Sequence, residues 1–155
     1  MGVAEDRLNG LGIALPSPDR PVANYVTEVR VGSLLFLSGA GPAPRPDRAM
    51  SRGKLGREMS VEQGYEAARS VGLVHIARLK ALLGELDRVA RIVKVLGMVN
   101  CVPDFVDQPA VVNGFSDLMV DVFGERGRHA RSAVGMATLP FSIPVEVEMV
   151  VEIAG

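Results

Sequence analysis

Residues 89–102 have the sequence VARIVKVLGMVNCV, an almost continuous run of Val, Ile, Leu and Met. β-Branched residues in a run of this length favour a strand over a helix. Apolar residues occupy both alternating sets of positions, which predicts a strand that is covered on both faces. Because two helices can cover only one face of a sheet, we expect the other face to be buried in a homo-oligomer.

Two amphipathic helices flank this strand along the chain. The first is predicted to begin at Ser60, which is followed three residues later by a glutamine in capping-box spacing, and to stop at Gly84. The second is predicted to begin at Asp107 and Pro109 and to end at Gly124. Apolar residues recur every three or four positions in both segments, so each helix is expected to bury one stripe.

Shorter β-rich runs complete the pattern. Two of them surround Gly32-Ser33, which predicts a hairpin, and two more lie near the C-terminus on either side of Pro140 and Pro144. The predicted order is β-β-α-β-α-β-β, an α+β domain with a sheet of about five strands packed on two helices. Besides the central strand, the expected strands cover residues 25–31, 34–37, 132–137 and 145–153.

Two segments lack regular periodicity. Residues 1–22 are rich in Gly and Pro and are expected to form an N-terminal extension that lies on a single domain of residues 23–155. The segment between Gly39 and about Met59 is rich in Gly, Pro and Arg and is expected to be a loop. Its length is unusual for a compact domain and suggests that it covers a site.

Composition excludes several classes of protein. The chain has 155 residues and a net charge of −1, without the positive surplus of a nucleic-acid binder, so no nucleic acid is expected as a partner. No apolar run approaches the ~20 residues of a membrane span, and the first residues do not resemble a signal peptide. The single cysteine, Cys101, cannot form an internal disulfide and agrees with a reducing compartment. We expect a cytoplasmic protein.

Few residues offer chemistry. The sequence contains no phosphate-binding glycine loop, no Cys/His metal spacing and no serine nucleophile motif, so neither metal nor cofactor is expected. His75 and His129 are too isolated to form a metal pair. Arg131 enters one strand, and Glu146 and Glu148 share one face of the last strand. By residue type alone, a solvated strand face with ordinary ion pairs is the favoured interpretation of these three.

The sequence around Arg131 resembles a known family. The segment HARSAV at residues 129–134, followed by Leu139-Pro140 and by VEVE at 145–148, is similar to the RidA/YjgF signature, in which Pro-Ala-Arg-Ser leads to Leu-Pro and a Glu-bearing last strand. Further blocks agree in order and extend the resemblance over residues 25–152; they are Tyr25-Val26, Leu37-Ser38-Gly39, and Asn113 with Phe123.

The resemblance implies a chorismate-mutase-like fold and a homotrimer with a central β-barrel, outer helices and three sites in the clefts between subunits. Characterised deaminases of the family hydrolyse enamines or imines such as 2-aminoacrylate to 2-keto acids and ammonia. By resemblance, Arg131 would hold a substrate carboxylate, and Glu146 would position water or move a proton. The positions implied to bind or enclose the substrate are Tyr25, Ser38, Gly39, Asn113 and Arg131.

Several residues depart from the family pattern. His129 replaces the usual proline, Ala133 stands where a cysteine is common, and Met149 replaces a small residue. These features resemble a divergent branch often labelled endoribonuclease, but neither histidine has an evident partner, and no basic surface with interleaved aromatic residues supports a ribonuclease. Two hypotheses remain: a trimeric imine deaminase, and a trimeric protein that binds a small carboxylated metabolite without turnover. Glu146 distinguishes them, because only the first requires it for chemistry.

Overall fold

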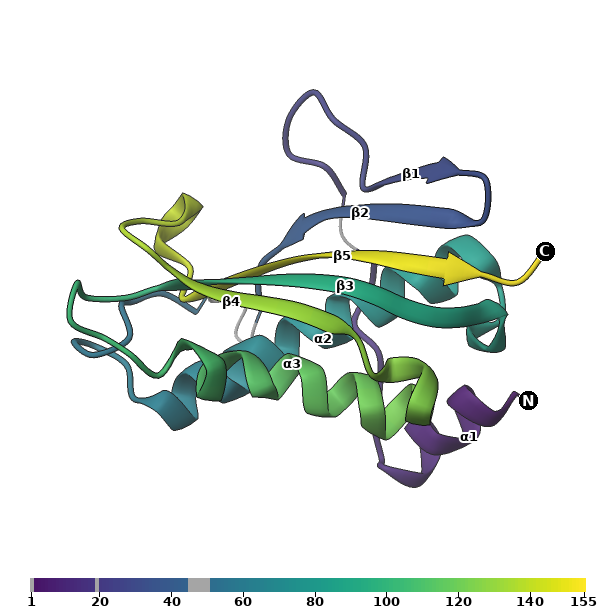
Figure 1. Cartoon of the computed structure of the whole chain (residues 1–155), viewed down its shortest axis with the longest axis horizontal. Coiled ribbons are helices and arrows are strands. Elements are labelled where there is room, and N and C mark those ends of the chain that lie inside the picture. The colour runs from purple at the N-terminus through teal and green to yellow at the C-terminus, as the bar shows by residue number, and fades with distance from the viewer. Residues whose placement is uncertain (1, 19, 45–50) are drawn as a thin grey trace.

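The computed structural model describes residues 2–18, 20–44 and 51–155. Its elements follow the predicted α+β order, with one additional N-terminal helix (Figure 1). The helices and strands are α1 (Val3–Gly10), β1 (Glu28–Val31), β2 (Leu34–Ala40), α2 (Val61–Leu83), β3 (Val89–Asn100), α3 (Gln108–Phe123), β4 (Ala130–Met136) and β5 (Val145–Ile153). Three short 3-10 helices are η1 (Leu86–Arg88), η2 (Gly124–Gly127) and η3 (Pro140–Ser142).

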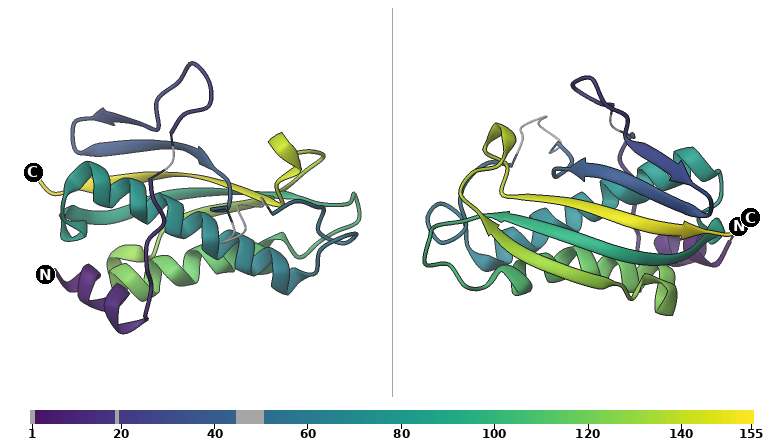
Figure 2. Two further views of the ribbon diagram at one scale, coloured as in Figure 1. Left: turned by 180° about the vertical axis from the view of Figure 1, so that it is seen from behind. Right: turned by 45° about the horizontal axis from the view of Figure 1, so that its top comes forward.

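The five strands form one sheet in the order β1-β2-β5-β3-β4. Only β3 and β4 pair in parallel; the other neighbours are antiparallel. Helices α2 and α3 lie across one face, and the view onto the sheet in Figure 2 (right) has the strands in front of both helices. One face of the sheet is therefore covered within the protomer, and the other, which we call the open face, is not.

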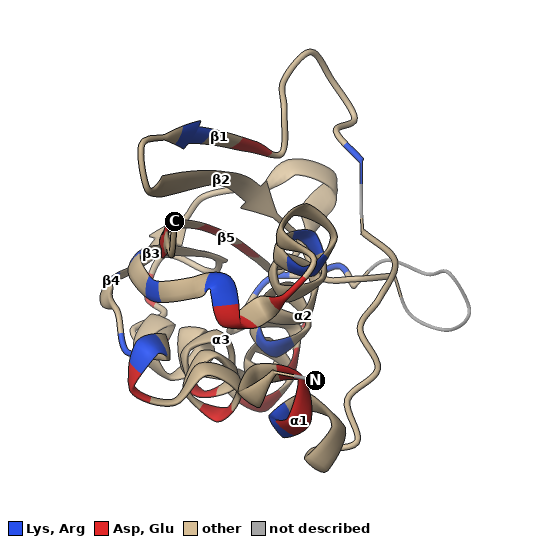
Figure 3. Ribbon diagram, turned by 90° about the vertical axis from the view of Figure 1, so that its right-hand side faces the viewer, with Lys and Arg blue, Asp and Glu red and all other residues tan. Residues whose placement is uncertain are grey.

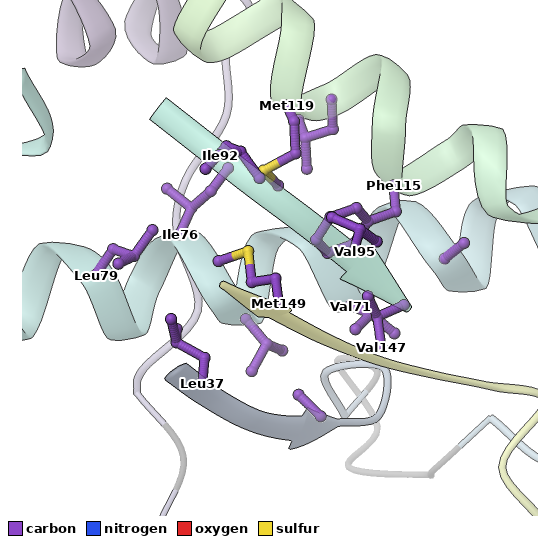
Figure 4. Close-up of a cluster of buried hydrophobic side chains, with 14 of the residues drawn as sticks. Leu37, Val71, Ile76, Leu79, Ile92, Val95, Phe115, Met119, Val147 and Met149 are labelled. Atoms are coloured by element: carbon purple, nitrogen blue, oxygen red, sulfur yellow. The ribbon is translucent and has the colours of Figure 1, made fainter. Parts of the chain in front are cut away.

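Alternation along β5 separates the two faces. Val145, Val147 and Val151 are fully buried against the helices and Met149 almost so, whereas the alternating residues Glu146, Glu148, Val150 and Glu152 point to the open face. The core contains side chains from both helices and from the inner face of the sheet, including Phe115 of α3 and Met149 of β5 (Figure 4). The helix layer is thus packed as the periodicity predicts.

The predicted caps of α2 are present. Gln63 N donates to Ser60 Oγ at 3.2 Å, and Ser60 N donates to Gln63 Oε1 at 2.9 Å, which completes the capping box. Gly84 ends the helix with a positive φ of 78°, a conformation that glycine adopts without steric cost. Local chemistry therefore fixes both ends of this helix.

Helix α1 was not predicted. It is short, but Ala4 and Leu8 are buried, and Asp87 accepts hydrogen bonds from the backbone N–H groups of Val3 and Ala4. Asp87 also pairs with Arg126 at 2.8 Å. A helix of this length depends on tertiary contacts, which a sequence pattern does not reveal. Part of the predicted irregular extension is therefore helical and docked on the domain.

The strand boundaries differ locally from expectation. The first strand begins at Glu28, so Tyr25 precedes it, and β2 continues through Ser38 and Gly39 with a register shift between Leu37 and Ala40. Such a shift is typical of a β-bulge, in which one strand has an extra residue and pairing continues beyond it. β3 ends at Asn100 because the chain then leaves the sheet to meet the loop after β2.

The second described part of that loop, residues 51–59, is attached to the end of the sheet. Leu55 is buried and bridges to Cys101, and Lys54 Nζ donates to Asn100 Oδ1 at 2.6 Å and to the carbonyl of Ala137. The loop borders a hollow of about 360 Å³ that includes neither Arg131 nor Glu146 among its lining residues. Residues 45–50 of the predicted loop lie outside the described residues.

The open face carries apolar side chains in every strand. Phe36 is 45% exposed and Val31 60% exposed, and a hollow of about 440 Å³ crosses this face. Charged side chains share this face, because Arg91, Lys94, Glu146, Glu148 and Glu152 also point to it. Charges of both signs lie on strands as well as helices in Figure 3. The strand positions that face this side and are apolar are Val29, Val31, Leu34, Phe36, Leu96, Met98, Val134 and Val150.

Helices α2 and α3 meet closely at Gly114. A Cβ atom at this position would overlap the Tyr65 carbonyl oxygen of α2. We expect Gly114→Ala to lower the free energy of unfolding by about 3 kcal/mol, because the two helices would have to separate. Urea denaturation followed by circular dichroism measures this change.

Gly10→Ala is the matched control, because Gly10 also lies in a helix and a Cβ atom added there would have no neighbour within 4 Å. This change is expected to leave stability equal or raise it by up to about 1 kcal/mol. Equal effects of the two substitutions would show that close helix packing at Gly114 is not required.

Candidate functional site

Arg131 lies in β4, and its guanidinium group is held against helix α3. Nη1 donates to Asn113 Oδ1 at 2.9 Å and to Ser116 Oγ at 3.0 Å, and Nη2 donates to the carbonyl oxygen of Pro109 at 3.3 Å. All three acceptors are neutral, and no carboxylate among the described residues forms an ion pair with Arg131. Its positive charge is therefore oriented but not neutralised.

These contacts leave one edge of the guanidinium group available. Three of its five N–H donors are used, including both on Nη1, and the remaining two belong to Nε and Nη2 of Arg131. Two neighbouring donors of this kind match the two oxygens of a carboxylate. The local structure thus offers a bidentate site for one carboxylate.

Ser116 links Arg131 to His129. His129 Nε2 lies 3.0 Å from Ser116 Oγ, and Nδ1 lies 2.7 Å from the carbonyl oxygen of Gly127. An open hollow of about 260 Å³ is lined by these three side chains together with Asp117, Val120 and Arg128. Burial lowers the pKa of His129, and the Arg131 charge lowers it further, against the opposing effect of the Gly127 hydrogen bond.

Glu146 lies in β5 and packs on Gly39 of β2. A Cβ atom at position 39 would overlap the Glu146 carboxylate in this position, so glycine lets the carboxylate approach the β2 backbone closely. Glu146 is half-buried. Burial raises the pKa of its carboxyl group, and the like charge of Glu148, two residues along the same face, raises it further. A carboxyl group with a raised pKa can exchange protons closer to neutral pH.

Ser38 lies next to Gly39 and is fixed by three contacts. Its hydroxyl donates to the Val26 carbonyl at 2.7 Å, its N–H donates to Thr27 O at 2.9 Å, and its carbonyl accepts from Arg78 Nη1 at 2.8 Å. These bonds connect the segment before β1 to β2. Exposed Tyr25 directly precedes Val26, whose carbonyl accepts the bond from the Ser38 hydroxyl. Ser38, Gly39 and Glu146 therefore form a second group.

The two groups lie on opposite faces of the sheet. Arg131 is in register with Val95, which is fully buried under the helices, so Arg131 points to the helix side. Glu146 is in register with Met98 and alternates with buried valines, so it points to the open face. The structure brings Arg131 and Asn113 together, and Gly39 and Glu146 together, but it does not join the two groups in one protomer.

The partners of Arg131 include residues that the sequence did not single out. Ser116 lies three residues after Asn113, a spacing that places both on one helix face, and His129 precedes Arg131 by two residues. These spacings are visible in the sequence, but they are too common to identify a site without the fold. Arg78 was not predicted either, because a buried arginine in a helix has no distinguishing sequence signal.

Metal ligands and membrane spans are two further features on which a function could depend. The described ranges contain no group of three or more His, Cys, Asp or Glu side chains placed to hold a metal ion. His75 lies in the core instead, with Nε2 at 2.8 Å from Val147 O and its ring edge-on to Phe115. In the same part of the chain, no helix has the length and apolar character needed to cross a membrane.

Known proteins resemble this chain over nearly its full length. Protein TCP17 of Trypanosoma cruzi is 46% identical over 147 residues, which cover 94% of this chain and 91% of that protein. The crystal structure of Atu1372 from Agrobacterium tumefaciens, a protein of unknown function, is 43% identical with a TM-score of 0.87, and the match covers 98% of this chain and 94% of that one.

A structure of RidA from the Antarctic bacterium Psychrobacter sp. PAMC 21119 is 26% identical with a TM-score of 0.59, and covers 88% of this chain and 94% of that one. Residues 5–153 match the family model described as "YjgF/chorismate_mutase-like, putative endoribonuclease". The match begins within helix α1 and includes both Arg131 and Glu146. The α+β fold and this match agree, and the chain belongs to the YjgF/chorismate-mutase-like family.

Proposed function

We propose that the protein is a homotrimeric deaminase that hydrolyses small enamine or imine acids in clefts between its subunits. The observation that carries this proposal is the placement of Arg131 and Glu146 on opposite faces of one sheet. Arg131, on the edge strand of one subunit, can approach Glu146 on the open face of the next subunit. Within one protomer the sheet separates the two side chains. The similarity to a protein named RidA supports a role of the Rid type.

The open face supports association of three copies. Its exposed Phe36 and Val31 belong to a surface of apolar side chains that continues across all five strands. An uncovered apolar sheet face of this extent is typical of an interface. Packing three such faces together would form the central barrel that the resemblance implies, and it would bring β4 of one subunit near β2 and β5 of another.

The chemistry suits an anionic imine. Arg131 would hold the substrate carboxylate through its available Nε and Nη2 donors, which stay charged at any working pH. An enamine such as 2-aminoacrylate first takes up a proton at its CH2 carbon to become the imine. Water then adds to the carbon of the C=N bond and forms a carbinolamine. Its collapse expels ammonia and leaves the 2-keto acid. Anchoring the carboxylate fixes the imine carbon relative to the attacking water, which lowers the entropic part of the barrier.

Glu146 would act on that water. As a carboxylate it can accept a proton while water attacks, and as a carboxylic acid it can return the proton to the departing amine. Its half-buried position and the neighbouring Glu148 both favour this exchange, because they raise the pKa of Glu146 toward the working pH.

Ammonia release from 2-aminoacrylate generated in situ tests the proposal. Wild type should accelerate release. Arg131→Ala should raise KM by roughly tenfold or more through loss of a charged hydrogen-bond pair. Glu146→Ala should lower kcat on the order of 100-fold or more while pyruvate binding persists.

Glu152→Ala provides a control, because Glu152 lies on the same face of β5 but away from Gly39. Pyruvate binding without ammonia release by any form would favour the carboxylate-binding protein. If wild type neither bound pyruvate nor released ammonia, the proposed substrate class would be wrong.

Mixed trimers test whether the site is shared between subunits. Arg131→Ala and Glu146→Ala chains, each inactive alone, should regain activity when coexpressed with different tags and purified through both. Every trimer that carries both tags keeps about a third of its sites intact, because Arg131 comes from one chain and Glu146 from its neighbour.

The double variant provides the baseline for the mixed trimers. No recovery in mixed trimers would mean that one protomer supplies both residues, since every subunit in the mixture lacks one of them. A monodisperse monomer in light scattering would also rule out a shared cleft.

The pH dependence of kcat/KM tests the role of Glu146. Activity should fall as pH decreases through the pKa of Glu146, because the carboxylate form accepts the proton. Glu148→Gln removes a like charge, so it should lower that pKa and move the acid limb to lower pH. Glu152→Gln should leave the limb in place. An unmoved or raised limb in Glu148→Gln would argue against Glu146 as the titrating group.

A further inference from the structure

We propose that His129 is a positioning residue for Arg131, and that it acts through Ser116 by accepting the serine hydroxyl proton in its neutral, Nδ1-protonated form. This inference rests on the proposed function, because it concerns how the same arginine is prepared for a carboxylate. The family resemblance assigns no role to either His129 or Ser116.

The hydrogen-bond partners determine the direction of each bond. The Gly127 carbonyl can only accept, so His129 Nδ1, at 2.7 Å, must carry a hydrogen. Arg131 Nη1 can only donate, so Ser116 Oγ accepts from it at 3.0 Å. The serine hydrogen is then directed to His129 Nε2, also at 3.0 Å. The chain therefore runs from Arg131 through Ser116 to His129 and ends at Gly127.

This direction requires an unprotonated Nε2. If His129 gained a second proton, its Nε2 would become a donor, and two positively charged groups would direct hydrogens at one hydroxyl oxygen. Ser116 would have to rotate its own hydrogen away from Nε2. Its oxygen could accept from both groups through two lone pairs, but the two cations would then repel each other across it, and this repulsion would push the Arg131 guanidinium group from its position. The hydrogen bond from Arg131 Nη1 to Ser116 Oγ would then weaken. The edge of the guanidinium group formed by Nε and Nη2 would no longer be held in one orientation.

The surroundings of His129 favour the neutral form. Burial has the largest effect and lowers the pKa of His129, and the Arg131 charge acts in the same direction. The other charged groups that line the hollow are Asp117 on α3 and Arg128 before β4. Arg128 pairs with Glu125, and Asp117 accepts from Tyr65 Oη at 2.9 Å, so both have partners of their own. The His129 ring also makes a T-shaped contact with the ring of Phe115, with 6.3 Å between the two centroids.

Positioning and simple electrostatics predict opposite effects of protonation. An added positive charge would by itself strengthen carboxylate binding, by roughly threefold across a water-filled hollow. Loss of an oriented, charged hydrogen bond would weaken binding by roughly tenfold or more. The second effect is larger, so we expect binding at Arg131 to weaken as His129 becomes protonated. By linkage, a bound carboxylate should lower the pKa of His129 further.

Nuclear magnetic resonance of the full chain with 15N-labelled histidine measures both the tautomer and the pKa. His129 should be the Nδ1–H tautomer at neutral pH, and His75, in the core, provides an internal reference. Ser116→Ala should raise the pKa of His129, because the neutral ring loses the hydrogen bond that it accepts. An Nε2–H tautomer, or a pKa unchanged by Ser116→Ala, would overturn the inference.

Titration with pyruvate provides the second readout, since this carboxylate stays ionised above about pH 4. Saturating pyruvate should lower the pKa of His129, and wild-type affinity should fall in acid. His129→Ala should bind roughly tenfold more weakly. His129→Gln, which keeps an acceptor for Ser116 but cannot titrate near neutral pH, should recover most of that loss and show no acid limb.

The possible outcomes separate this inference from the proposed function. If pyruvate raised the pKa of His129, the histidine would act on the ligand only through its charge, and its positioning role would be overturned. Arg131 would still be a carboxylate site. Equal affinities of wild type and His129→Ala at every pH would also overturn it. If wild type bound no pyruvate while the tautomer agreed, the carboxylate site itself would be wrong, and the inference would fail with it.

Discussion

Two helices cover only one face of a five-stranded sheet, and this constraint determines how the rest of the molecule is used. The inner face is filled mainly by buried apolar residues such as Phe115 and Met149, with His75 and Arg78 buried among them. The proposed site residues lie instead on the edge strand β4, on the open face and in the segments that border them. Arg131 occupies the first of these places, and Glu146 occupies the second.

Local chemistry explains which parts of the fold the sequence could predict. The capping box at Ser60, the glycine stops and the alternation of residues 145–153 each act within a few residues, and the structure confirms all of them. Helix α1 depends on Asp87, a residue far away in the sequence, so no local pattern could predict it. The continuation of β2 through Gly39 likewise depends on β5, whose Glu146 occupies the space that a side chain would fill.

The candidate site shows the same division. Residue type left Arg131, Glu146 and Glu148 as candidates, and only the resemblance to the RidA/YjgF signature singled out Arg131 and Glu146 among them. Their placement on opposite faces follows from the strand order and from the register of β3 with both β4 and β5. A shift of one residue in either pairing would exchange the faces, and periodicity within a single strand does not fix that register.

The contacts of the two histidines bear on the endoribonuclease description of the family model. Acid–base cleavage of RNA by histidines needs two such groups facing one phosphate, with cations along the strand. His75 instead lies in the core against Val147, and His129 turns toward Ser116 and Gly127. Helix α3 carries the acidic side chains Asp117 and Asp121 and no Lys or Arg, so it offers no row of cations for a polynucleotide, and the available edge of Arg131 fits a single carboxylate. These features agree with the proposal of a small acid, rather than a polynucleotide, as the substrate.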